Sequence, residues 1–229
     1  MKLTLLPKDP LFPDPNLADA EGLVGLSQDI NPERLKAAYS QGIFPWFEEQ
    51  NLFFWFSPDP RMVLFADELK IHKSMRPYFN QQKLTVTFDT AFARVMQQCA
   101  AAKRHDQEKT WISKNFIESY TQLHTQGLAH SVEVWQNSVL VGGLYGVSLG
   151  AAFFGESMFS ALPNASKFGF ISLVKWLQKQ NINLIDCQVY NAHLASLGAK
   201  EMPRKQFLDT LKITQKEPTK VGKWNYSLG

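Results

Sequence analysis

Apolar positions recur along this chain with two periods, one typical of helices and one typical of strands. The stretch NPERLKAAYSQG, residues 31–42, predicts a short helix that Asn31 caps, Pro32 begins and Gly42 ends. Four more helices are expected, over residues 66–75, 90–102, 114–127 and 164–181.

Three residues are expected to set the ends of these helices. Pro77 follows the first of them and is expected to end it, because proline lacks the N–H that continues a helix. Asp89 and Ser113 precede the next two, and their side-chain oxygens are suited to accept the free N–H groups of a first helical turn.

Strands are predicted where apolar residues alternate or run together. A tight turn at Asn137 and Ser138 joins two of them into a hairpin. The predicted strands cover residues 84–89, 131–136, 139–150, 151–159 and 181–189. Helices followed by a meander, then a helix and a strand, is an α+β order.

A rigid junction divides the chain. The aromatic-rich stretch before it contains strand-like segments broken by prolines, and Pro58, Asp59 and Pro60 then follow in direct succession. We therefore expect a small N-terminal domain over residues 1–60 and a larger domain over residues 61–229.

Polar side chains interrupt two of the apolar strands. Asp186 and Gln188 stand within LIDCQV, and the strand period predicts that both point to one face. Glu156 stands within FFGESMF. A buried carboxylate is costly without partners, so each acid either accepts hydrogen bonds that stiffen the core or serves a site. Their occurrence on two strands favours a shared cleft.

Composition narrows the function classes. The formal net charge is +3, from 24 basic and 21 acidic residues, which is too small to indicate a nucleic-acid partner unless a local patch carries that role. Cys99 and Cys187 are far apart in sequence and are expected to be reduced thiols of a cytosolic protein. The uncharged run between Glu133 and Glu156 contains five glycines and predicts a β-meander rather than a membrane helix.

Three kinds of active site find no support in the motifs. The five histidines show no ligand spacing with each other or with the cysteines, so no metal site is expected. There is no G-x-S-x-G motif, and Ser157 has no obvious neighbouring base. The stretch GGLYG matches neither a Walker loop nor a dinucleotide fingerprint.

Aromatic and basic residues leave two interpretations open. Tyr39, Trp46, Trp111 and Tyr120 are suited either to the core or to stacking on nucleotide bases. A set of basic residues has two equally good explanations, a stripe that faces phosphates or an ordinary solvated helix surface. The set is Lys70, Lys73, Arg76, Lys83, Lys103, Arg104 and Lys109.

A series of motifs in order from residue 38 to residue 204 closely resembles one bacterial family, the leucyl/phenylalanyl-tRNA–protein transferases. The series is AYSQGIFPWF, WFSPDPRMVL, HSVEVW, VGGLYGV, FGESMFS, NASK, LIDCQV and HLASLGAKEMPR. The resemblance implies transfer of leucine or phenylalanine from charged tRNA onto proteins that begin with Lys or Arg, which creates a destabilising N-terminus. It also implies a catalytic domain resembling the GNAT N-acyltransferases, with no metal and no soluble cofactor.

Roles for individual residues come from the same resemblance. It implies that Asp186 and Gln188 form the catalytic pair, and that Gly155 and Glu156 belong to the substrate cleft. The terminal adenosine and the acceptor are expected to contact aromatic residues, Tyr39, Trp46, Trp111 and Tyr120. The apolar pocket for the transferred side chain is expected to involve Leu144, Met158 and Ile185. Leu173 and the thin set of cations over residues 70–84 depart from the family pattern, which affects the expected tRNA footprint.

The residue types suit this chemistry. The donor is an activated ester, so the protein has only to help a free α-amine attack it, and that amine has an ordinary pKa of about 7.7–8.0. Asp186 is expected to take the amine proton, directly or through Gln188. Three rivals remain open: an acyl-CoA N-acetyltransferase, whose pyrophosphate loop is missing before the helix at residue 164; a non-catalytic RNA-binding module; and an aminoacyl-tRNA-dependent ligase of cell-wall precursors. A cytosolic monomer is expected.

Overall fold

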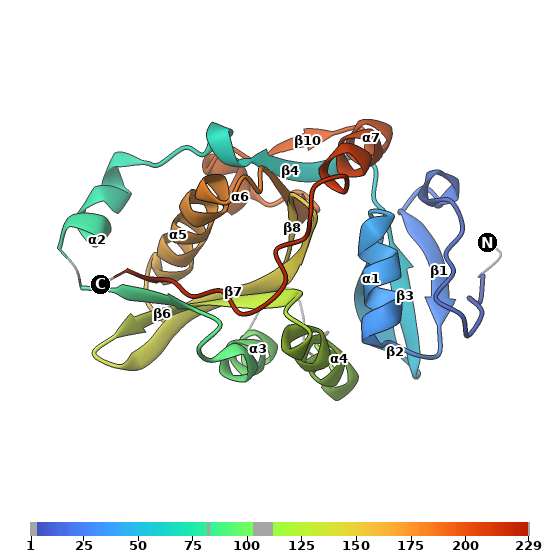
Figure 1. Ribbon diagram of the computed structural model, residues 1–229, viewed down its shortest axis with the longest axis horizontal. Helices are drawn as coiled ribbons and strands as arrows, with labels where there is room; N and C mark the ends of the chain where they lie inside the picture. The colour runs from blue at the N-terminus through green and yellow to red at the C-terminus, as the bar shows by residue number, and fades with distance from the viewer. Residues whose placement is uncertain (1–3, 82, 103–111, 229) are drawn as a thin grey trace.

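The computed structural model of the chain describes residues 4–81, 83–102 and 112–228. Two β-sheets organise it, a small one near the N-terminus and a large one formed by the rest of the chain (Figure 1). Helices pack on both sheets, which makes this an α+β protein with a small N-terminal part and a larger part built on a mixed sheet.

The small sheet has the strand order β1-β3-β2 and is antiparallel throughout. Its strands are β1 (Leu23–Ser27), β2 (Phe44–Glu49) and β3 (Leu52–Phe56). Helix α1 (Pro32–Ser40) lies beside them and begins as predicted, because the Asn31 side chain accepts the Arg34 N–H at 2.8 Å. Gly42 follows the helix with a φ of +71°, a backbone conformation that glycine adopts without steric cost.

The large sheet has the strand order β10-β4-β9-β8-β7-β6-β5-β11. All neighbouring strands run antiparallel except β8 and β9, which are joined through helix α5 (Ala165–Lys179). The strands are β4 (Arg61–Phe65), β5 (Thr85–Phe88), β6 (Ala129–Gln136), β7 (Val139–Leu149), β8 (Ala152–Ser160), β9 (Leu184–Gln188), β10 (Lys200–Met202) and β11 (Ser227–Leu228).

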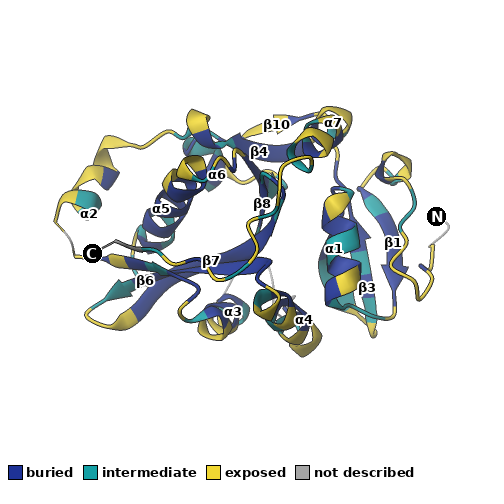
Figure 2. Cartoon of the chain, in the orientation of Figure 1, coloured by how far each residue is buried: buried dark blue, intermediate teal, exposed yellow. Residues whose placement is uncertain are grey.

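Helices cover both faces of the large sheet. Helix α5 packs on one face, and α3 (Phe92–Ala101) and α4 (Lys114–Thr125) pack on the other (Figure 1). Strands β7 and β8 are buried along most of their length, whereas the short helix α2 (Arg76–Asn80) is mostly exposed (Figure 2). The remaining helical segments are short turns at Pro15–Leu17, Ala66–Glu68 and Lys73–Met75, with α6 (Ala192–Ser196) and α7 (Arg204–Thr214).

One hydrophobic core joins the small sheet to the large one. Leu35 of α1 and Trp55 of β3 belong to the same buried cluster as Tyr145 of β7 and Phe207 of α7. A second cluster, formed by α5 and the other face of the large sheet, includes Leu144 and Ile185. The two sheets are therefore joined by shared apolar packing and not only by a linker.

Most predicted elements are present, and three local predictions are wrong. The helix expected over residues 66–75 does not form; only two short 3-10 turns, Ala66–Glu68 and Lys73–Met75, lie there. Pro77 does not end a helix; it stands in the first turn of α2, where its missing N–H costs nothing. Asp89 does not cap α3, because its carboxylate accepts the N–H groups of Ser131 and Trp224. Helix α3 has no side-chain cap; Glu133 accepts the N–H of Ala91, the residue just before the helix, at 3.2 Å.

Candidate active site

A cavity of about 420 Å³ lies where strands β8 and β9 part. Their parallel pairing covers Ala152–Phe154 and Leu184–Asp186, after which β8 continues to Ser160 beside β7 alone. Where β8 and β9 separate, backbone and side-chain groups of both strands face the same cavity. The cavity size falls in the range that small-molecule sites occupy.

Glu156 reaches this cavity because of a β-bulge in β8. Tyr145 pairs with Ser157 and Gly146 pairs with Gly155, so Glu156 is an extra residue without a partner on β7. The bulge needs a glycine at position 146, since a Cβ there would come within 2.2 Å of the Phe154 carbonyl oxygen.

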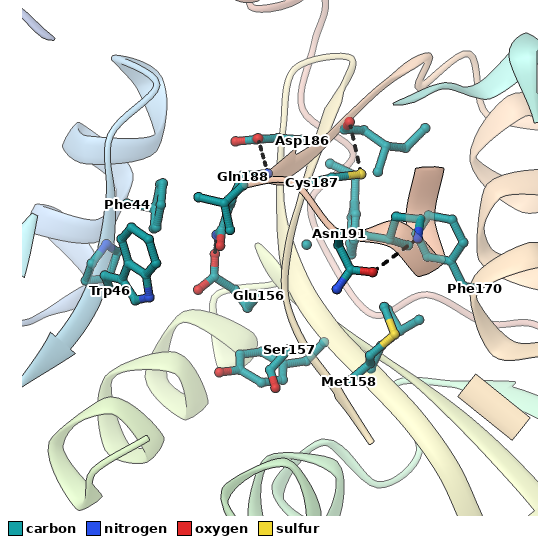
Figure 3. A pocket seen from close by; sticks show the side chains of 18 residues that line it. Phe44, Trp46, Glu156, Ser157, Met158, Phe170, Asp186, Cys187, Gln188 and Asn191 are labelled. Carbon is teal, nitrogen blue, oxygen red and sulfur yellow. Dashed lines mark hydrogen bonds between the residues drawn. The ribbon is translucent and has the colours of Figure 1, made fainter. Parts of the chain in front are cut away.

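A second bulge separates Asp186 from Gln188. Met62 of β4 pairs with Gln188 and Val63 pairs with Asp186, so Cys187 is the extra residue, and Gln188 has a φ of +65°. The prediction that Asp186 and Gln188 share a face is therefore wrong: the strand period is broken between them. The Asp186 side chain binds Arg61 of β4, whereas the Gln188 side chain points toward Glu156 (Figure 3).

Asp186 forms a fully buried ion pair with Arg61. Arg61 Nε donates to Oδ1 at 2.8 Å and Nη2 donates to Oδ2 at 2.6 Å, and neither side chain has exposed surface. The guanidinium lies between the rings of Phe44 and Phe207, 4.7 Å from each centroid. Asp186 Oδ1 also accepts the backbone N–H of Gln188 at 2.9 Å. This network fixes the end of β9.

Glu156 is the centre of a second network, which opens to the cavity. Gln188 Nε2 donates to Oε1 at 2.8 Å, and the Tyr120 hydroxyl donates to Oε2 at 2.9 Å. The Tyr39 hydroxyl forms a short hydrogen bond with that of Tyr120. Burial raises the pKa of Glu156 to about 7, with the tyrosine hydrogen bonds acting in the opposite direction.

The cavity has apolar side chains at both ends and hydrogen-bonding groups between them. Phe44 and Trp46 lie at one end, and Met158 and Phe170 lie at the other, with Glu156 between them (Figure 3). Further apolar lining comes from Pro45, Leu144, Phe153, Ile185, Val189 and Leu194. A molecule that spans the cavity therefore meets rings, then hydrogen-bonding groups, then an apolar surface.

Comparison with known proteins identifies the chain. A sequence profile described as leucyl/phenylalanyl-tRNA protein transferase matches residues 63–212, and the profile of that protein's N-terminal domain matches residues 28–59. The chain belongs to the leucyl/phenylalanyl-tRNA protein transferase family. It is accordingly an enzyme, an aminoacyltransferase that uses aminoacyl-tRNA and a protein as its substrates.

Individual members of the transferase family match over nearly their whole length. The leucyl/phenylalanyl-tRNA–protein transferase of Flavobacterium johnsoniae is 54% identical over 205 residues, which is 90% of this chain and 97% of that protein. The transferase of Myxococcus xanthus is 50% identical over 214 residues, or 93% of this chain and 92% of that protein.

Likeness to solved structures is more distant. The C-terminal domain of a putative lysylphosphatidylglycerol synthetase from Agrobacterium fabrum matches with a TM-score of 0.42 and 13% identity, over 75% of this chain and 57% of that chain. A likeness at this level identifies no fold family. Across the described residues, no helix has the length and apolar character that crossing a membrane requires.

The cavity brings together most of the site residues that the sequence of this transferase predicts. Its lining includes eight of them, Trp46, Leu144, Gly155, Glu156, Met158, Ile185, Asp186 and Gln188. Tyr39 and Tyr120 are fully buried behind Glu156 and act on it through their hydroxyls. Trp111, with Lys103, Arg104 and Lys109, lies outside the described residues.

Several lining residues were not predicted. Phe44, Phe153, Phe170 and Leu194 are ordinary apolar residues, and their sequence gives no sign of a cavity. Arg61 does not line the cavity, but it pairs with Asp186, and the sequence does hint at such a partner: Arg61 stands at the start of an apolar strand, where an unpaired cation would be costly. Within the described ranges, no three His, Cys, Asp or Glu side chains lie close enough to hold a metal ion.

Proposed function

We propose that this enzyme moves leucine or phenylalanine from charged tRNA onto the α-amino group of proteins that begin with Lys or Arg. Family membership supports the reaction class. The observation that carries the substrate assignment is the layout of the cavity, with an aromatic end, an apolar end and a hydrogen-bonded Gln188–Glu156 pair between them.

The donor fits the cavity in one direction. Leu144, Met158 and Ile185 supply an apolar surface for the transferred side chain, and Trp46 is half-buried beside Phe56 with room for the terminal adenosine to stack. Stacking of a base on an aromatic ring contributes about 1–3 kcal/mol. The ester that links the two parts then lies beside Gln188 and Glu156.

The acceptor binds through charge as well as through its amine. Arg61 compensates the charge of Asp186, so the negative charge available in the cavity is that of Glu156. An N-terminal Lys or Arg brings a second positive charge, which this carboxylate attracts more strongly in the half-buried site than it would in water. A preference for cationic N-termini follows from that attraction.

Asp186 and Gln188 act as a catalytic pair in this proposal. Asp186 accepts two bonds from Arg61 and one from the Gln188 N–H, and it has no exposed surface. Of the two routes by which Asp186 would assist the amine, this geometry favours the one through Gln188. The Gln188 side-chain carbonyl remains to accept a hydrogen bond from the attacking amine, because its amide nitrogen is bound to Glu156.

The finer architectural assignments also belong to this proposal. A boundary near residue 60 is supported by the change from the small sheet at β3 to the large sheet at β4. A GNAT-like catalytic domain is supported by the bulged β8 and its divergence from the parallel β9. The enzyme acts as a cytoplasmic monomer without a cofactor, and its products carry destabilising N-termini.

One assay tests the proposal against its rivals. The enzyme is incubated with Leu-tRNA carrying radiolabelled leucine and with two peptides that differ only in beginning with Arg or with Glu. Label is expected on the Arg peptide alone. Label from acetyl-CoA in place of leucine would identify an N-acetyltransferase, label on a cell-wall precursor would identify the ligase, and no transfer at all would leave an RNA-binding module.

A further inference from the structure

Gln188 is hydrogen-bonded to two carboxylates that both line the cavity, but only Glu156 has exposed surface. Asp186 receives three hydrogen bonds and is completely enclosed. Glu156 receives one hydrogen bond on each oxygen, which leaves a further lone pair on each. It also lies beside the position that the ester occupies in the proposed binding mode.

We propose that Glu156 is the proton acceptor of the transfer reaction. This assignment rests on the proposed function and adds a catalytic role to a residue otherwise expected only to bind substrate. Gln188 places the amine, and Glu156 removes its proton.

The step balances without any added reagent. The nitrogen of the acceptor's α-amine forms a bond to the ester carbonyl carbon, and one N–H proton passes to a Glu156 oxygen. The bond from that carbon to the ribose oxygen then breaks, and Glu156 returns the proton to the leaving oxygen. A peptide bond and a free ribose hydroxyl result, and Glu156 is again a carboxylate.

The surroundings of Glu156 suit a group that takes and returns a proton. A base is most effective when its pKa lies near the working pH, and burial places that of Glu156 at about 7. Asp186 raises this pKa further, while Arg61 and the two tyrosine hydroxyls lower it. The titratable and charged groups around Glu156 are Tyr39, Arg61, Tyr120, Tyr145, Asp186 and Cys187.

The two tyrosines behind Glu156 hold it in place for this role. Burial raises the pKa values of Tyr39 and Tyr120 well above the ordinary value, so both keep their protons at neutral pH. Tyr120 then donates permanently to Oε2, and Tyr39 supports Tyr120 from α1. Loss of the Tyr120 hydroxyl would therefore move the pKa of Glu156 upward.

The test measures single-turnover transfer of leucine from Leu-tRNA to a saturating Arg-initiated peptide between pH 5.5 and 9. In the wild type we expect a rise in rate with a midpoint near 7, in addition to the ionisation of the peptide amine at about 7.7–8.0. Glu156→Gln should reduce the rate about 100-fold or more and remove the rise near 7. Tyr120→Phe should move that rise to higher pH.

The controls separate this role from folding and from substrate binding. Glu133→Gln removes another buried carboxylate of the same sheet, outside the cavity, and should keep the pH profile. Added formate should raise the transfer rate of Glu156→Ala at least 10-fold over its rate without formate, because formate supplies the missing base. Thermal unfolding checks that each variant is folded. If Glu156→Gln does not fold, the shift of the pH profile in Tyr120→Phe tests the role of Glu156 instead.

Other results would overturn the assignment. A Glu156→Gln rate within about threefold of wild type, or an unchanged pH profile, would exclude Glu156 as the base. A raised KM for the peptide with unchanged kcat would limit Glu156 to holding the acceptor's cation. Failure of the wild type to transfer leucine would instead overturn the proposed function itself.

Discussion

Arg61 and Asp186 compensate each other's charge in the protein interior, where neither side chain has exposed surface. Arg61→Met should destabilise the protein by about 3–5 kcal/mol, because it leaves an uncompensated buried carboxylate. The double variant Arg61→Met/Asp186→Leu should recover most of that stability in denaturant unfolding. It should still transfer poorly, because the Gln188 N–H has lost its acceptor; near-wild-type transfer would show that the pair only stabilises the fold.

Glu156 makes a contribution to stability that depends on pH. The folded protein holds this proton up to about pH 7, whereas the unfolded chain loses it near 4.5, so the contribution of Glu156 falls as pH rises between those values. Glu156→Gln carries no charge and should be more stable than wild type at pH 8, by roughly 1–3 kcal/mol. Denaturant unfolding at pH 4 and pH 8 checks this, and an equal difference at both values would contradict it.

Trp46 gives a third test at the level of single residues. Trp46→Ala should weaken use of the charged tRNA, with an increase in KM of about 5- to 100-fold, because a stacked base loses its platform. The KM for the acceptor peptide should change little. Phe54→Ala removes another ring of the small sheet that does not line the cavity, and it serves as the matched control. Unchanged KM for Leu-tRNA would return Trp46 to a packing role.

Three of the polar groups in this network could be found from the sequence, because each interrupts an apolar strand. Asp186, Gln188 and Glu156 all lie at the cavity. Their individual roles could not be found in the same way, since these depend on partners distant in sequence. Arg61 is 125 residues from Asp186, and nothing local to either residue shows that they meet.

The bulge in β8 is the element that aims Glu156, and it depends on close backbone contact with β7. Gly146→Ala should destabilise the protein by about 2 kcal/mol or more, because the new Cβ would meet the Phe154 carbonyl. Gly155→Ala on the facing strand is the control for stability, since its Cβ would meet only the Asp186 carbonyl, at 3.5 Å. Equal unfolding midpoints for the two variants would contradict this account.

Helices and turns could be predicted where neighbouring residues determine them. The ends of elements could not be predicted where residues distant in sequence determine them. The Asn31 cap and the turn at Asn137 and Ser138 involve neighbours in sequence, and both are present. The N–H just before α3 is bonded to Glu133, a residue of β6 more than thirty positions away. The short segments β10 and β11 have too few residues to show a period, so they were not predicted.

The shared core makes the whole chain one cooperative unit. Because Leu35 and Trp55 of the N-terminal part pack in one cluster with Tyr145 and Phe207, neither part buries its apolar surface alone. We expect a single thermal transition, with tryptophan fluorescence and circular dichroism changing together. Two separated transitions would show that the parts fold independently. The order of strands in the large sheet could not be predicted, since it is set by this packing.

The ion pair between β4 and β9 also has a consequence for how sequences of this kind diverge. Loss of either charge alone leaves the other stranded in the interior, so single replacements at position 61 or 186 are blocked on stability grounds before any effect on turnover. The ion pair can be replaced without this loss of stability only if both residues change together. We therefore expect the two positions to change together, although 125 residues separate them in the sequence.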